Sequence, residues 1–283
     1  MTYTYEDKRN KELRVNCEKC FGLCCVALYF SSCDGFPTNK DAGKPCINLQ
    51  PDFTCSVHKN LRKKGLKGCT AYDCFGAGQK VAQVTYGGHD WRKSPESANQ
   101  MFEVFLIMRQ LHEMLWYLSE AFVLQKDHCI REEISSLIDN TEHLTILDAE
   151  SLLALDVEAH RTKVNMLLKN TSELIRTKYC SRKNGTLRNR KTSHCGLDYF
   201  GADLRRINLR GADLRGACLI AANLRGVDLS GADFIGADLR DADFSGANLT
   251  NSIFLTQAQI NTTKGDLHTK LPMMLVRPSH WSK

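Results

Sequence analysis

Residues 202–256 read ADLRR INLRG ADLRG ACLIA ANLRG VDLSG ADFIG ADLRD ADFSG ANLTN SIFLT, which is eleven consecutive steps of five residues, each centred on Leu or Phe. A twelfth step, LDYFG, begins at Leu197. A period of five matches neither a helix nor an ordinary strand, whose side chains repeat every 3.6 and 2 residues. It predicts a solenoid in which each pentad forms one side of a square coil and every fifth side chain points at the axis. Such solenoids typically present binding surfaces, which favours a scaffold over an enzyme.

The positions beside each centre fit the same square coil. The residue two before the centre is usually Ala, because only a small side chain fits between stacked walls; it is Ala212, Ala217, Ala222, Ala232, Ala237, Ala242 and Ala247. The residue just before the centre is Asp or Asn in most pentads. Its side chain is expected to hydrogen-bond to neighbouring backbone at the corners.

These pentads resemble the pentapeptide repeat family, whose motif A(D/N)LXX they match in most steps. The resemblance implies a right-handed quadrilateral β-helix, here over residues 197–262. With four pentads to a turn, residues 20 apart should stack at about 4.7–4.9 Å. Phe200 then lies over Ile220, and Ile235 lies over Leu255 near Ile253. Exposed apolar side chains aligned in this way mark an interface, so we expect this corner to pack on helices or on a second subunit.

The best-known pentapeptide repeat proteins mimic DNA and bind type II topoisomerases, and the resemblance makes this one possible function. A DNA mimic needs a long acidic face that replaces the phosphate charge. Residues 197–256 instead contain eight Asp and six Arg. We therefore rank topoisomerase binding below the functions considered next and expect no nucleic-acid partner.

A second feature is the concentration of cysteine near the start of the chain. Nine of the thirteen cysteines lie between Cys17 and Cys74. In a reducing cytoplasm, clustered thiols are typical of metal ligands first and redox sensors second. Pairs spaced Cys-x2-Cys and Cys-x2-His hold one metal well, and thiolate with imidazole suits zinc or an iron–sulfur cluster. The candidate ligands are Cys17, Cys20, Cys24, Cys25, Cys33, Cys46, Cys55, His58, Cys69 and Cys74.

Ten donors are enough for two tetrahedral zinc sites or for one to two iron–sulfur clusters. Three interpretations stay open: a structural metal, a functional metal or cluster, and metal-free thiols that sense oxidant or fill a core. The spacing CxxCxxxCC over residues 17–25 resembles the opening of a family of zinc- or iron-chelating domains, which implies a metal and no reaction. GCTAYDCFGAGQ and the closing GDLHTKLPMMLVRPSHW resemble a bacterial family described only as pentapeptide repeat-containing.

Between these two features the pattern is helical. Apolar spacing predicts helices from Ser94 to about Phe122, over 129–138, and from 148 to about 177. A basic run, Arg176 to His194, contains no acid and predicts a linker. We expect a multidomain α+β protein: a Cys-rich metal-binding module (1–90), a helical bundle (91–178), a basic linker (179–196), the pentapeptide β-helix (197–262) and a C-terminal tail or cap (263–283).

The expected function follows from these parts. The charged start MTYTYEDKRNKELRVN does not resemble a signal peptide, and charges interrupt the apolar stretch 101–124, so we expect a cytoplasmic protein without a membrane span. No catalytic motif is present, and we expect a metal-binding scaffold that binds a protein partner. The alternative is a metal- or Fe–S-dependent redox enzyme or sensor, with Tyr72, Asp73 or His89 as proton-transfer groups. A homodimer through one end of the solenoid also stays open.

Overall fold

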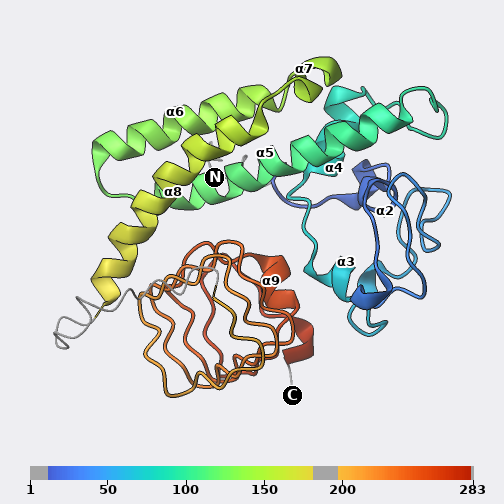
Figure 1. Cartoon of the computed structure of the whole chain (residues 1–283). Helices are drawn as coiled ribbons and strands as arrows, with labels where there is room; N and C mark the ends of the chain where they lie inside the picture. Colours follow the sequence, from blue (N-terminus) through green and yellow to red (C-terminus); the bar gives the residue numbers. More distant parts are fainter. Residues whose placement is uncertain (1–11, 181–196, 282–283) are drawn as a thin grey trace, which may run out of the picture. The chain divides into compact units, whose positions relative to one another are not determined.

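The computed structural model describes residues 12–180 and 197–281 (Figure 1). The chain divides into two compact units, Met1–Leu168 and Lys169–Lys283. Most of the predicted basic linker, residues 181–196, lies outside the described residues, as do residues 1–11 and 282–283.

The first unit begins with a cysteine-rich segment of short helices and loops. In chain order these are η1 (Cys17–Lys19), α2 (Leu23–Ala27), η2 (Ser32–Asp34), η3 (His58–Asn60), α3 (Lys67–Ala71), α4 (Ala77–Lys80) and the π-helix η4 (Val81–Thr85). Two isolated antiparallel bridges join its loops, Phe30 to Lys40 and Leu49 to Cys55. The segment therefore has little regular backbone pairing, and the packing of its side chains and loops has to stabilise it.

Four helices follow: α5 (Ala98–Leu124), α6 (His128–Leu144), α7 (Ala149–Leu153) and α8 (Val157–Tyr179). The long α5 packs against both α6 and α7 (Figure 1). Our predicted end of the second helix at residue 138 is wrong, because Thr141 extends the buried face of Ile134 and Ile138 by another turn. The predicted third helix is two helices, since Asp156 accepts from the Ala159 amide at 2.9 Å and starts α8. No helix in the described ranges is long and apolar enough to cross a membrane.

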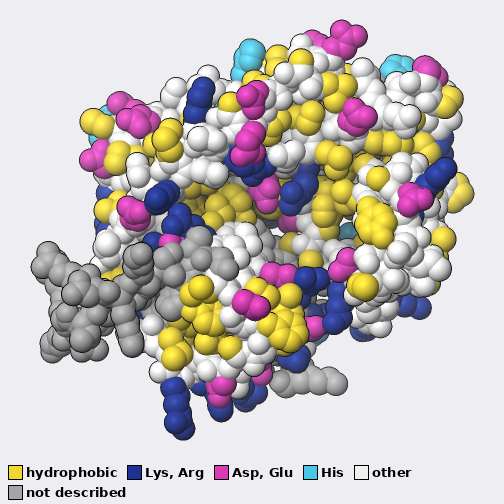
Figure 2. Space-filling view, viewed as in Figure 1, with side chains coloured by type: hydrophobic (Ala, Val, Ile, Leu, Met, Phe, Trp, Pro, Cys, Tyr) yellow, Lys and Arg dark blue, Asp and Glu magenta, His cyan; other side chains and the backbone are white. Residues whose placement is uncertain are grey.

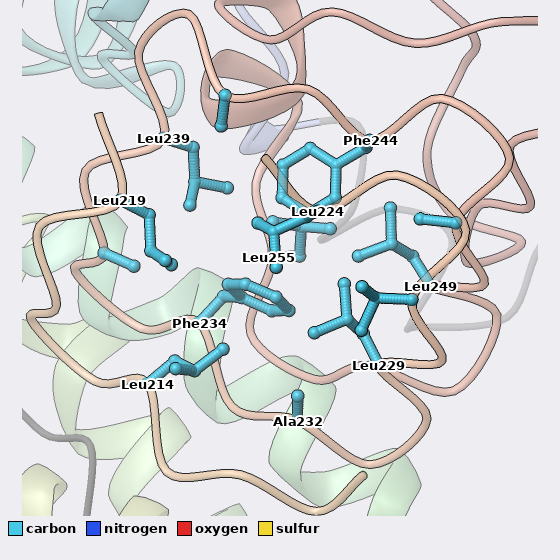
Figure 3. Packing of buried hydrophobic residues seen from close by; sticks show 14 of the residues in the cluster. Leu214, Leu219, Leu224, Leu229, Ala232, Phe234, Leu239, Phe244, Leu249 and Leu255 are labelled. Carbon is cyan, nitrogen blue, oxygen red and sulfur yellow. The ribbon is translucent and has the colours of Figure 1, made fainter. Parts of the chain in front are cut away.

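In the second unit, residues 197–256 form a coil whose backbone returns to the same position every fourth pentad (Figure 1). Asp213 bridges to Asp233, and Asp233 bridges to Ile253, both in parallel. The central side chains point inward: Leu214, Phe234 and Leu249 are fully buried (Figure 3). The interior assignment of the Leu and Phe positions is therefore confirmed.

The predicted α+β fold class with a C-terminal β-helix is wrong. Within residues 12–180 and 197–281 no β-strand and no sheet forms, and the regular secondary structure is helical. Successive turns of the coil are joined by isolated bridges, one residue from most pentads. The physical reason is the turn that follows each bridge. The side chain of Asp233, for example, accepts from the Ile235 amide at 2.9 Å, and Gly236 has a φ of +66°. The chain bends before a second residue can pair.

The C-terminal tail closes one end of the coil. Helix α9 (Gln257–Asn261) begins with a capping box between Thr256 and Gln259. The Gln259 side chain also donates to the carbonyls of Phe234 and Ala237, each at 2.9 Å. Trp281, on η5 (Ser279–Trp281), is 1% exposed and joins the same apolar core. The tail thus shields the last turn of the core from water.

The last turns of α8 belong to this second unit and lie against the coil. The Ser172 hydroxyl donates to the buried Asp233 carboxylate at 2.6 Å, and Arg176 Nε donates to the Gly211 carbonyl at 3.0 Å.

The predicted apolar corner is only partly covered. Ile253 is 1% exposed, whereas Phe200 is 67% exposed, so the described part of this chain covers Ile253 and does not cover Phe200.

Candidate functional site

Five of the predicted ligands come together in one apolar cluster of the first unit, here called the buried thiol group: Cys24, Cys25, Cys46, Cys55 and Cys69. Phe30, Phe36 and Leu66 pack among them. The sulfur atoms of Cys24 and Cys25 are 4.0 Å apart, and the Cys25 thiol is also hydrogen-bonded to Cys55. Residues that are far apart in the sequence thus place their thiols side by side.

Three further cysteines, Cys17, Cys20 and Cys74, form a second set, here called the α4 thiol group. Cys17 and Cys74 both lie close enough to Cys20 for their ionised forms to raise its pKa. A Cβ added to Gly78 would lie 2.5 Å from Cys20 Sγ, so glycine allows that sulfur to approach the helix backbone. Gly78 and Gly76 also direct their backbone N–H groups at the Cys74 sulfur. The close approach explains why a glycine occupies position 78.

A polar tether holds the segment that carries the α4 thiol group. Gln79 accepts from the Asn16 amide at 2.6 Å and donates to the Arg14 carbonyl at 3.0 Å. Gln83 donates to the Lys19 carbonyl at 2.9 Å. Sequence reasoning missed both glutamines, because a side chain that bonds to distant backbone leaves no spacing pattern. The only local signal for Gln79 was its place directly after the glycine-rich residues 76–78.

The ionisation of these thiols is governed mainly by burial and by their neighbours. Burial raises the pKa of Cys20 and of Cys69 to about 12, and it raises the pKa of Cys17 and Cys74 as well. The hydrogen bond to Cys24 raises the pKa of Cys25. Backbone N–H groups oppose this at Cys20, where Leu23 and Gly22 favour the thiolate. Cys17, Cys20, Cys69 and Cys74 therefore need a nearby cation to ionise near neutral pH.

Two of the predicted ligands lie apart from the others. Cys33 is exposed on η2. His58 is also exposed, and it lines an open cavity of about 750 Å³ together with Cys17. In the part of the chain that the structure describes, no three Cys, His, Asp or Glu side chains are arranged to hold a metal ion.

Helix α5 supports the loop between the two thiol groups through Arg109. Arg109 Nε donates to the Asp73 carbonyl at 3.1 Å, and its guanidinium lies 5.5 Å from the centre of the Tyr72 ring. Burial raises the pKa of Tyr72 well above its ordinary value and raises the pKa of Asp73. His112 is buried against the Phe75 carbonyl at 2.8 Å, and burial lowers its pKa to about 4. Its geometry is that of a packed side chain.

The outer surface of the coil carries paired charges. Arg205 contacts Asp203 at 2.7 Å, Arg225 contacts Asp243 at 3.2 Å, and Arg210 pairs with Asp228. Figure 2 shows both signs of charge on the coil face turned to the viewer, together with apolar side chains. The large apolar residues exposed on the first pentads are Leu197, Phe200 and Ile207. A continuous acidic surface is not formed by these pairs.

Comparison with known proteins supports the repeat assignment of the coil. The chain is 56% identical over 278 residues to "Uncharacterized protein YybG" of Bacillus subtilis (strain 168), covering 98% of each chain. The chain belongs to the YybG family. Residues 201–231 and 217–254 match the family described as pentapeptide repeats, with eight copies. No solved structure matches this member of the YybG family.

Proposed function

We propose that this protein is a metal-binding scaffold, in which the cysteine-rich segment holds zinc and the pentapeptide coil binds a protein partner. The observation that carries the metal assignment is the gathering of eight of the ten predicted donors into the buried and α4 thiol groups. We place this scaffold in the cytoplasm, where reduced thiols persist.

The donor set fits zinc in chemical terms. Zinc prefers thiolate and imidazole ligands, and structural sites take four of them. Cys25, Cys46, Cys55 and Cys69 would hold an ion in the apolar cluster, while Cys17 of the α4 thiol group lines the cavity together with His58. When bound, zinc supplies cross-links between loops that have little regular structure. The chain's own residues supply backbone N–H groups that stabilise the thiolates of Cys20, Cys55 and Cys74.

The coil supplies the interaction surface of the proposed scaffold. Its stacked walls are rigid, because every fifth side chain is buried and each turn bridges to the next. Phe200 is 67% exposed, and Leu197 of the same pentad is 44% exposed. Aromatic residues exposed on a rigid surface are enriched in protein interfaces. The paired charges around them favour a protein partner over nucleic acid and weigh against a DNA mimic.

A redox enzyme or sensor is the second candidate function, and the short distances between thiols are the observation that favours it. Cys24 and Cys25 have sulfur atoms 4.0 Å apart, and Cys55 is bonded to the same Cys25 thiol. An oxidant that accepts two electrons could convert the Cys25 and Cys55 thiols to a disulfide, whereas the adjacent Cys24 and Cys25 do not match ordinary disulfide geometry. Iron with stoichiometric sulfide would support this candidate, whereas zinc would support the scaffold.

The test is metal content in protein purified anaerobically without added metal. The scaffold predicts zinc at one or two ions per chain, with Cys55→Ser and Cys25→Ser losing metal. Cys129→Ser is the matched control, since Cys129 is exposed on α6 and outside both thiol groups. Wild-type protein without any metal would refute the metal assignment.

A second experiment tests the coil. Phe200→Asp should abolish co-purification of the partner. Met273 is 97% exposed on the tail, so Met273→Asp should retain the partner.

A further inference from the structure

The tail that closes the coil exposes a group of large apolar side chains. More than half of the surface of each is exposed, and they are Leu267, Met273, Met274 and Val276. Single exposed apolar residues are ordinary, but a group of them marks an interaction surface. These four residues, together with the exposed Lys264 and Lys270, are here called the cap surface.

The two methionines of the cap surface lie at the tip of a turn. The Leu275 amide donates to the Pro272 carbonyl at 3.1 Å, so Met273 and Met274 are the two central residues. Leu275 is buried in the apolar core of the coil. The turn is therefore anchored at its base, and it presents both methionines outward.

Hydrogen bonds to backbone join this turn to the loop that carries Leu267. The Arg277 guanidinium donates to the Asp266 carbonyl and, at 2.9 Å, to the Thr269 carbonyl. These two carbonyls flank Leu267, and Arg277 directly follows Val276. The apolar side chains of the cap surface are thus held on neighbouring, fixed stretches of backbone.

The exposed charges of the cap surface are positive. Lys264 and Lys270 are exposed, and the one acidic residue in 257–281 is Asp266. The Asp266 carboxylate accepts from the amides of Gly246 and Thr269, each at 2.9 Å. A symmetric contact with a second copy would place two positive surfaces against each other. Charge complementarity therefore favours an anionic occupant over self-association.

An anionic lipid surface fits the cap surface better than an acidic protein does. The residues that dominate binding energy in protein interfaces are enriched in Trp, Tyr and Arg, and lysine is depleted there. In the tail, Trp281 is 1% exposed and Arg277 is bonded to backbone carbonyls. The exposed groups are aliphatic side chains, two of them methionines, beside lysines. Peripheral proteins bind anionic membranes with this combination.

We propose that the cap surface binds anionic membranes, with Met273 and Met274 entering the headgroup boundary and Lys264 and Lys270 contacting lipid phosphates. Each lysine near an anionic bilayer strengthens binding about fivefold, and burial of the methionines adds to this. The contact is peripheral and reversible, because it buries few side chains. It depends neither on the metal nor on the protein partner proposed above.

The test is cosedimentation of the full-length protein with vesicles. One set contains phosphatidylglycerol and phosphatidylcholine in equal parts, and the other contains phosphatidylcholine alone. Wild type should bind the anionic vesicles, more weakly as salt rises, and should bind the neutral vesicles least. Met273→Asp should weaken binding by about tenfold or more, because it replaces an apolar contact with a negative charge. Met166→Asp is the matched control, since Met166 is exposed on α8 outside the cap surface, and it should bind like wild type.

A lysine pair tests the electrostatic part separately. Lys270→Ala should weaken binding to anionic vesicles about fivefold. Lys126→Ala should leave it unchanged, since Lys126 is exposed between α5 and α6. Lys270→Ala removes only an exposed side chain, so this comparison stays valid if Met273→Asp disturbs the turn.

Three results would overturn the inference. The first is absence of binding to anionic vesicles, or equal binding to neutral ones. The second is an equal loss in both members of either pair of variants. The third is Met273→Asp that loses the coil's protein partner and keeps vesicle binding, which would make the cap surface a protein interface. Metal content and capture of the partner are measured separately, so failure of either earlier proposal is distinguishable from failure of this one.

Discussion

Asp233 gives the sharpest test of how α8 and the coil are joined. Its carboxylate is fully buried, accepts from Ser172 at 2.6 Å and lies 3.7 Å from Arg215. Burial raises its pKa to about 6 from the ordinary 3.8, against the pull of these partners. At about 1.36 kcal/mol per unit, this shift corresponds to roughly 3 kcal/mol that favours the protonated form on folding. The stability associated with the protonated Asp233 carboxyl is fully present below the pKa of this group in the unfolded chain. It is lost as pH rises through the folded-state pKa of about 6.

The free energy of unfolding, measured by urea denaturation from pH 5 to pH 7, should reveal this group. With a pKa of 3.8 in the unfolded chain and about 6 in the folded chain, Asp233 should lower the unfolding free energy of wild type by roughly 1 kcal/mol between pH 5 and pH 7. Asp233→Asn keeps an acceptor for Ser172 but does not titrate, so the loss should disappear. Asp243→Asn is the control, because Asp243 occupies the same position of another pentad. Burial alone would raise the pKa of Asp243, but hydrogen bonds from Ser245 and Arg225 lower it below 3.8. Parallel pH profiles for wild type and Asp233→Asn would refute the reasoning.

Three further predictions concern the same unit and the thiols. Ser172→Ala removes the donor to the buried carboxylate, so unfolding free energy should fall by about 1–3 kcal/mol and the loss above pH 6 should steepen. Gly231→Ala places a Cβ 2.3 Å from the Tyr179 ring at a φ of +74°, and should cost more stability than Gly216→Ala, which has a φ of +61° and no atom nearby. Zinc binding should release protons, because burial holds the pKa of thiols such as Cys20 near 12; calorimetry in buffers of different ionisation enthalpy measures this.

Three results would contradict these expectations. An unchanged pH profile in Ser172→Ala would mean that the hydroxyl does not influence the carboxylate. Equal losses for the two glycine variants would show that backbone strain alone matters and that the helix does not lie tightly on the coil. Zinc binding without proton uptake by buffer would mean that the ligands are already ionised in the metal-free chain.

The interior of the coil could be predicted from sequence because one rule governs each pentad. Leu214 and Phe234 are buried as the five-residue period requires, and Asp233 accepts from the backbone as its place before the centre suggests. The same period did not show how the chain pairs between turns. A five-residue period alone cannot show whether neighbouring turns of the coil pair through whole strands or through single bridged residues. The chain bends after each central residue, so neighbouring turns are joined only by isolated bridges.

The candidate site was predictable in composition and not in arrangement. Cysteine spacing predicted the candidate donors, but it did not show that Cys25 and Cys55, thirty positions apart, are neighbours that meet through loop packing. Gln79 and Arg109 act on backbone from a distance, which no motif records. Arg176 was included in a basic run predicted as a linker, yet it lies in α8 and pairs with Asp213 at 3.3 Å.

Metal content per chain, measured on anaerobically purified wild type beside Cys55→Ser and Cys129→Ser, is the most direct test of the metal-binding scaffold. We expect one or two zinc ions in wild type and in Cys129→Ser, and fewer in Cys55→Ser. Metal-free wild type, or equal zinc in all three proteins, would contradict the metal assignment.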